Sequence, residues 1–226
     1  MLKLAISSEN NLHLSPYSPQ SHTYIYIWQH HLNAEALDKL YQSTILNGHL
    51  DESLSLFHGK RYTERISVRI MLQQLLGTES TLDYLKTGRP QLNSGIAEIS
   101  ISHTGNIYAV SLSHERHGMD IEQWGDKAFK LADRFLCEEE LTLLHNPSTP
   151  LLCSPERNAT LLWSAKESIY KYADCPGLSF KDDIRLTHTA GKELKAKLRF
   201  TQEELSINFE ALPNCILTCC KGTPFA

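Results

Sequence analysis

The chain has 226 residues, of which 41% are hydrophobic, and carries a formal net charge of −4 at pH 7. This length is sufficient to bury a substantial core, either as one domain or as two fused halves. The negative net charge argues against nonspecific nucleic-acid binding. No hydrophobic stretch approaches the length of a membrane span, and the apolar residues among the first ten are too few for a secretory signal. We therefore expect a cytoplasmic protein without membrane or nucleic-acid partners.

The hydrophobic pattern predicts a mixed α/β chain in two parts. In the first part it predicts strands at 23–28, 82–86, 98–102 and 108–112, and helices at 34–45 and 66–76. The second part starts with a strand around Asp120, followed by helices at 126–136 and 138–144. A long helix begins after Ser154, an N-cap residue that precedes a proline at the first helical position. Antiparallel strands are predicted at 183–187, 194–200, 205–210 and 215–219.

The cysteine pattern is typical of free thiols. Six cysteines include no Cys-x-x-Cys pair, and Cys219 and Cys220 are adjacent, which argues against a disulfide or zinc framework. We assign the segment 215–220 to the core of a strand. A transition-metal site made of His114, His117 and Asp120 is an alternative use of the histidines, although without a helix there the two histidines need not share a face.

The predicted strand around Asp120 carries a pair of acids. Successive side chains of a strand alternate between its faces, so Asp120 and Glu122 point to one side, and Met119 and Ile121 point to the other. A wet strand face is the ordinary explanation of an Asp-x-Glu pattern. The apolar neighbours argue instead that this carboxylate pair lies close to the interior.

The long helix adds a third acid and a cation. Trp163, Glu167 and Lys171 follow one another at i, i+4 and i+8, so they share one stripe of the helix. A Glu and a Lys four residues apart are most often a solvated surface pair, but the aromatic residue places this stripe near the interior. Three carboxylates from a strand and a helix suit Mg²⁺, which binds through carboxylates together with substrate phosphates.

Two further segments offer partners for phosphate. Ser102 and His103 stand near the end of a predicted strand, before a turn at Gly105, where a hairpin that uses them for turn hydrogen bonds is the alternative. The turn Thr87-Gly88-Arg89-Pro90 provides a guanidinium group, whose planar fork suits phosphate.

In this order, the segments resemble the 4′-phosphopantetheinyl transferases of the surfactin-synthetase-activating (Sfp) type. The segments that carry the resemblance are Gly88-Arg89-Pro90, Ile101-Ser102-His103-Thr104-Gly105, Gly118-Met119-Asp120-Ile121-Glu122 and Trp163-Ser164-Ala165-Lys166-Glu167-Ser168 with Lys171. The predicted helix at 65–77 looks like the arginine-bearing helix of the family. The resemblance covers roughly residues 58–180. Each motif alone has low specificity, whereas four motifs in order at compatible spacing are specific.

The resemblance implies both a reaction and a fold. Such enzymes transfer the 4′-phosphopantetheine arm of coenzyme A to a serine of an apo acyl- or peptidyl-carrier protein and release adenosine 3′,5′-bisphosphate. The implied fold is α+β, with two similar α/β halves, residues 1–115 and 116–226, in a pseudo-twofold arrangement and the active site at their interface. We expect a monomer. The carrier could serve fatty acid, polyketide or nonribosomal peptide synthesis.

The resemblance also implies roles for individual residues. The metal ligands would be Asp120, Glu122 and Glu167, and Glu167 would also be the base for the attacking hydroxyl group. Catalysis would further use Lys171 and His103, which contact phosphate oxygens. The binding of coenzyme A, including its 3′-phosphate, would use Arg69, Arg89, Pro90, Ser102, His103 and Lys171.

Some features depart from the family pattern, and two other functions remain open. Gln73 stands where many members carry a second arginine, and the segment 172–177 has one residue more than the family pattern. The basic residues at the start of the upstream helix suit coenzyme phosphates or an acidic carrier protein, but also a solvated helix face. The alternatives to the transferase are a Mg²⁺-dependent pyrophosphate or phosphoester hydrolase and a noncatalytic module that binds carrier proteins.

Overall fold

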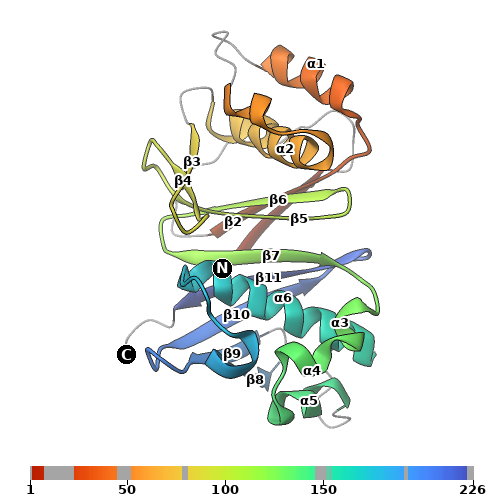
Figure 1. Cartoon of the computed structure of the whole chain (residues 1–226), viewed down its shortest axis with the longest axis vertical. Coiled ribbons are helices and arrows are strands. Elements are labelled where there is room, and N and C mark those ends of the chain that lie inside the picture. The colour runs from red at the N-terminus through yellow and green to blue at the C-terminus, as the bar shows by residue number, and fades with distance from the viewer. Residues whose placement is uncertain are drawn as a thin grey trace. The chain divides into compact units, whose positions relative to one another are not determined.

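The computed structural model describes residues 2–7, 23–44, 52–77, 81–145, 152, 154–190 and 193–222. Its contacts divide the chain into two compact units, Met1–Glu115 and Arg116–Ala226, each with its own sheet and helices (Figure 1). The architecture is a mixture of helices and mainly antiparallel sheets, which confirms the α+β class. None of the helices in the described part of the chain has the length and hydrophobicity that a membrane span requires.

The N-terminal unit is built on a four-stranded sheet. In spatial order the strands are β1 (Leu2–Ser7), β2 (Thr23–Gln29), β6 (Ile107–Ser113) and β5 (Glu98–Thr104). Only the β1–β2 pair is parallel. Helix α2 (Gly59–Leu76) packs against the sheet and against α1 (Ala34–Thr44), and its Ile66 and Ile70 are fully buried in a core that also contains Trp28. The unit also contains the 3₁₀ helix η1 (Glu52–Leu56) and a hairpin of β3 (Leu82–Tyr84) and β4 (Pro90–Leu92).

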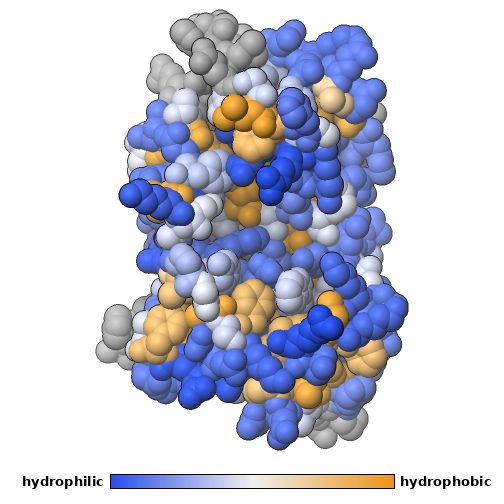
Figure 2. Space-filling view, viewed as in Figure 1, coloured by the Kyte–Doolittle hydropathy of each residue, from blue (hydrophilic) through white to orange (hydrophobic). Residues whose placement is uncertain are grey.

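The surface of the protein is mostly hydrophilic and is interrupted by smaller hydrophobic patches (Figure 2). Leu56 at the end of η1 is 75% exposed. The guanidinium group of Arg65 in α2 lies over the rings of Phe57 and Tyr84, 5.1 and 4.2 Å from their centroids. The cation–π contact with Tyr84 joins the helix to the β3–β4 hairpin.

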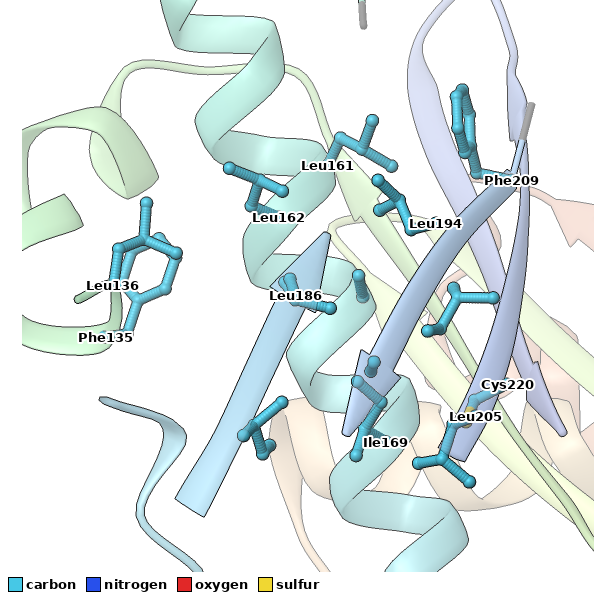
Figure 3. Close-up of a cluster of buried hydrophobic side chains, with 14 of the residues drawn as sticks. Phe135, Leu136, Leu161, Leu162, Ile169, Leu186, Leu194, Leu205, Phe209 and Cys220 are labelled. Atoms are coloured by element: carbon cyan, nitrogen blue, oxygen red, sulfur yellow. The ribbon is translucent and has the colours of Figure 1, made fainter. Parts of the chain in front are cut away.

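The C-terminal unit is a five-stranded antiparallel sheet covered by a long helix. In spatial order the strands are β7 (His117–Gln123), β11 (Cys215–Gly222), β10 (Glu204–Ala211), β9 (Glu193–Leu198) and β8 (Ile184–Ala190). The helices are α3 (Lys127–Lys130), α4 (Ala132–Phe135), α5 (Glu138–His145), α6 (Pro155–Ala173) and α7 (Phe180–Asp183). Leucines and Ile169 of α6 face apolar side chains of the sheet, among them Leu194 and Phe209 (Figure 3).

Most predicted elements of the described residues are present, and the start of α6 is confirmed in detail. Ser154 caps this helix, because its hydroxyl oxygen accepts a hydrogen bond from the backbone N–H of Arg157, with Pro155 in the first turn. Cys215, Cys219 and Cys220 are buried in β11, which confirms the core strand predicted there.

Several predicted boundaries were wrong. Helix α2 begins at Gly59 rather than at residue 66, because its first turns are mostly solvated and lack the apolar repeat that marks the buried part. The predicted helix 126–136 is two short helices, and at the break the Leu131 N–H bonds to the Ala128 carbonyl, a 3₁₀-type contact. The strand 82–86 ends at Tyr84 and pairs with an unpredicted strand that starts at Pro90. The end of the predicted helix 34–45 lies outside the described residues.

Candidate functional site

A glycine sets the distance between β7 and α6. A Cβ atom at Gly118 would lie 2.0 Å from the carbonyl oxygen of Ser168 and 2.6 Å from the backbone nitrogen of Tyr172. Real Cβ atoms do not approach backbone atoms this closely, so only glycine permits the strand and the helix to pack at this distance. This close packing brings the side chains that follow Gly118 in β7 against the C-terminal half of α6.

The two acids of β7 both meet side chains of α6. Lys171 Nζ donates hydrogen bonds to Asp120 Oδ1 at 2.7 Å and to the carbonyl oxygen of Met119 at 3.1 Å. Trp163, at the N-terminal end of the same helical stripe, donates a hydrogen bond from its Nε1 to Glu122 Oε1 at 3.1 Å. The acids therefore share the face of β7 that α6 covers, as strand alternation predicts. The contacts also show that α6 runs antiparallel to β7.

Glu167 lies between these two contacts on the helical stripe. Its pKa is raised from 4.5 to about 7, mainly because burial disfavours the charged carboxylate. The negative charges of Asp120 and Glu122 raise the pKa further, and the ammonium group of Lys171 lowers it in part. The other three charged groups are thus close enough to influence Glu167. A carboxyl group with a pKa near 7 suits proton transfer at neutral pH.

The donor set of this cluster fits a hard divalent cation. Asp120, Glu122 and Glu167 offer carboxylate oxygens, the ligands that Mg²⁺ prefers, and the single ammonium group of Lys171 leaves an excess of negative charge when all three are ionised. Within the described ranges, no three His, Cys, Asp or Glu side chains are already arranged closely enough to enclose a metal ion. The residues therefore fit the cation in kind and charge, and ligation requires the carboxylates to draw closer together.

The predicted phosphate-binding residues Ser102 and His103 lie next to each other on β5. Ser102 is buried, whereas the side chain of His103 is 39% exposed. His103 Nε2 lies 3.5 Å from Glu64 Oε2 of α2, and its ring lies near that of Tyr108. The imidazole is therefore partly accessible but has a carboxylate neighbour that the strand pattern could not reveal.

The predicted arginines are both engaged within the N-terminal unit. Arg89, in the turn before Pro90 at the start of β4, forms an ion pair with Glu98 at the start of β5. Arg69 in α2 is only 6% exposed, and its Nη2 lies 3.3 Å from Ser53 Oγ. The prediction that these residues and the acids of β7 face one another at an interface between the units stays a prediction.

Other polar residues hold the site together and were not predicted. Arg116 Nε and Nη2 donate to the carbonyl oxygens of Tyr172 and Ala173, at 2.7 and 2.9 Å. A cation at this position satisfies the last carbonyl groups of α6 and interacts favourably with the helix dipole. Ser164 of the same helix bonds to Thr218 of β11, with 2.9 Å between the hydroxyl oxygens. No sequence signal marks these contacts, because each joins residues far apart in the chain.

The alternative metal site at His114 is not formed. His117 is buried in β7 whereas His114 is exposed, and the described residues contain no cluster of three potential ligands. The acids of β7 and α6 that influence the pKa of Glu167 therefore stay the candidate site.

The comparisons with known proteins agree with this location. None of the curated proteins compared with the chain is similar enough to count as a match. Residues 116–220 match the family model of the 4′-phosphopantetheinyl transferase superfamily. This range covers β7, α6 and nearly all of the C-terminal sheet. Residues 116–220, which include the acids and Lys171, are therefore similar to a domain of the 4′-phosphopantetheinyl transferase superfamily.

Proposed function

We propose that the chain is a Mg²⁺-dependent 4′-phosphopantetheinyl transferase of the Sfp type. It would transfer the phosphopantetheine arm of coenzyme A to a serine of an apo-carrier protein and release adenosine 3′,5′-bisphosphate. The observation that carries this proposal is the convergence of Asp120, Glu122, Glu167 and Lys171 within the domain that matches the superfamily. The same residue types in an ordinary surface pair would show neither the burial nor the mutual influence that these groups show.

The reaction needs a base and a positioned nucleophile. The serine oxygen attacks the phosphorus that bears the pantetheine arm, and the bond from this phosphorus to the bridging pyrophosphate oxygen breaks. Adenosine 3′,5′-bisphosphate leaves with the electron pair, and the proton of the serine hydroxyl passes to the base. Glu167, with a pKa of about 7, can accept a proton near neutral pH.

The negative charge of the pyrophosphate must be balanced before a nucleophile can approach. Lys171 places an ammonium group at the site, held by Asp120 and by the carbonyl oxygen of Met119, and would contact phosphate oxygens. Asp120, Glu122 and Glu167 would hold Mg²⁺, which supplies further charge neutralisation at the pyrophosphate. The hydrogen bond from Trp163 orients Glu122 for this task.

In this proposal the N-terminal unit binds coenzyme A. His103 and Ser102 on β5 and Arg89 with Pro90 in the hairpin would contact its phosphate groups, with Arg69 nearest to the 3′-phosphate. Support comes from the chemistry of these side chains and from the partial exposure of His103. The five cysteines that the structure describes are all free thiols, which supports the cytoplasmic location that we propose together with a monomeric state.

Mass spectrometry of an apo-carrier protein tests the proposal. The chain is incubated with coenzyme A, Mg²⁺ and a panel of apo-carrier domains from fatty acid, polyketide and nonribosomal peptide synthesis. We expect one or more carriers to gain a phosphopantetheine group, and a carrier whose acceptor serine is replaced by alanine to gain none. Free phosphopantetheine with unmodified carriers would instead indicate a hydrolase. Carrier binding without any turnover would indicate a noncatalytic module.

A further inference from the structure

The lysine directly before Glu167 takes no part in the acidic cluster. Lys166 is fully buried, and its Nζ donates to Glu140 Oε2 at 2.6 Å and to the carbonyl oxygens of Phe180 at 2.7 Å and Ile184 at 3.3 Å. An ammonium group has three N–H donors, and these three contacts use all of them. Lys166 therefore has no donor left for a phosphate group, although it lies within the motif that resembles a catalytic segment.

The partner of this lysine is equally enclosed. Glu140 is 1% exposed, and its Oε2 also accepts a hydrogen bond from the backbone N–H of Cys137, just before α5, at 3.0 Å. Its Oε1 accepts from the backbone N–H of Leu186 in β8 at 2.7 Å. Apart from the ion pair itself, all these contacts are to backbone groups. The pair therefore ties α6 to the start of α5, to α7 and to β8.

We propose that Lys166 and Glu140 form a positioning pair that sets the rotation of α6 and thereby places Glu167 against β7. Successive residues of an α-helix are about 100° apart around its axis. A helix held on one flank at Lys166 thus presents Glu167 on the neighbouring flank, where Gly118 permits close packing. This inference rests on the proposed function, because the rate of transfer is the property that a misplaced base would lower.

The expected effect of losing the pair follows from helix geometry. Rotation of α6 by about 20° would move a Cβ atom by roughly 1 Å, given the radius of a helix. A displacement of about 1 Å in a catalytic group can lower a rate on the order of 10²-fold. The single variant Lys166→Met is a poor test, since it leaves the buried charge of Glu140 without its counter-ion and is expected to unfold the domain.

The experiment uses a paired replacement and a matched control in the full chain. Lys166→Met combined with Glu140→Gln removes both charges and keeps the length of both side chains. The control is Leu194→Ala, which opens a cavity in the same core beside Leu161 but takes no part in the Lys166 contacts (Figure 3). For each variant, thermal melts and the kcat and KM for coenzyme A are measured, the kinetics well below the lowest melting temperature.

We expect the paired variant to lose kcat by roughly tenfold or more, with a KM for coenzyme A within about threefold of wild type. The control should keep its kcat even if it melts at a similarly lowered temperature. Unchanged kcat in the paired variant, or an equal loss in both variants, would overturn the inference. If the paired variant does not fold, Glu140→Asp decides the question in the same assay, because it keeps both charges and withdraws the carboxylate by one methylene group.

A wild-type chain that modifies no carrier would overturn the proposed function rather than the positioning role. Binding of Mn²⁺, followed by electron paramagnetic resonance, then decides on the pair, because it reports the arrangement of the acids without turnover. We expect the paired variant to bind Mn²⁺ several-fold more weakly than wild type and than Leu194→Ala. Equal affinity in all three proteins would show that the pair does not position the acids.

Discussion

The charged residues that we assign to the site interact differently in the two units. In the C-terminal unit, Asp120, Glu167 and Lys171 interact with one another across the β7–α6 contact. In the N-terminal unit, Arg89 and His103 each lie beside a separate local carboxylate. A cluster of the first kind carries an excess of negative charge when its carboxyl groups are ionised, and a bound cation can neutralise this charge. Residues of the second kind already have a carboxylate neighbour, so a ligand must compete with that carboxylate for them.

This difference predicts a division of effects. Variants of the C-terminal cluster should alter turnover strongly and jointly, since the groups act as a unit. Variants of the N-terminal residues should alter the affinity for coenzyme A and do so independently. The following tests are arranged from the largest expected effect to the smallest, and each can break or sharpen the comparison.

The largest effect is expected from Glu167→Gln. This change keeps the shape of the side chain but removes proton acceptance and one negative charge, so turnover should fall on the order of 10²-fold or more. The measurement is single-turnover transfer to an apo-carrier, with a thermal melt of the same sample. Glu156→Gln, on an exposed position of the same helix, is the matched control. Wild-type turnover in a Glu167→Gln protein would show that Glu167 has no role in the reaction.

A second, somewhat smaller effect is expected from Gly118→Ala. The added Cβ would meet the Ser168 carbonyl oxygen at 2.0 Å, so α6 must shift away from β7. Turnover should fall more than tenfold, and the free energy of unfolding should fall by about 1–3 kcal/mol. Gly125→Ala provides the control, because its Cβ would meet nothing within 4 Å and it lies on the loop that follows β7. Equal behaviour of the two variants would refute the role that we assign to close packing.

The charge of the cluster should also be measurable without any substrate. The pKa of Glu167 is about 7 in the folded chain against 4.5 as its ordinary value. Between these values the folded state binds more protons than the unfolded state, so the stability of metal-free protein should fall as pH rises from about 4.5 to about 7. In Glu167→Gln this fall should be absent, which leaves the variant more stable than wild type at pH 8 by on the order of 1–3 kcal/mol.

Denaturant melts in the presence of a chelator, at pH 5 and at pH 8, measure this difference. The Glu156→Gln control should follow wild type at both values. A wild-type protein that is no less stable at pH 8 than the Glu167→Gln variant would show that the acids do not strain the metal-free site.

Periodicity predicted which side chains of the C-terminal cluster share a face of their own strand or helix. The alternation of β7 placed Asp120 and Glu122 on one face, and the helical repeat placed Glu167 and Lys171 on one stripe; both patterns are local properties of the chain. The buried contact of Lys166 with Glu140 could not be predicted in this way. It joins residues 26 positions apart, and neither residue breaks the pattern of a surface helix when the sequence is considered alone.

The N-terminal unit shows the same limit. The hairpin turn at Gly88 was predicted from its glycine and proline, but the pairing of Arg89 with Glu98 depends on how β4 lies beside β5. The early start of α2 was missed because its first turns are solvated, and solvated turns carry no hydrophobic repeat. What a sequence predicts well is the face of an element, and what it predicts poorly is which distant group that face will meet.

The smallest effect, and the one that bears most directly on the N-terminal unit, is expected from Glu98→Gln. In the structure the Glu98 carboxylate forms an ion pair with the guanidinium group of Arg89. Our proposal assigns this guanidinium group to a phosphate of coenzyme A. The pair is partly solvated, since Glu98 is 45% exposed, so its strength is at most about 1 kcal/mol. Removal of the competing charge should therefore tighten coenzyme A binding by up to about fivefold and leave kcat unchanged.

Isothermal titration with coenzyme A measures this affinity, and Arg89→Ala in the Glu98→Gln background should abolish the gain. Weaker binding in Glu98→Gln would show instead that the carboxylate holds Arg89 in a productive position. The N-terminal residues would then resemble the C-terminal cluster in depending on one another, and the contrast between the two units would be lost.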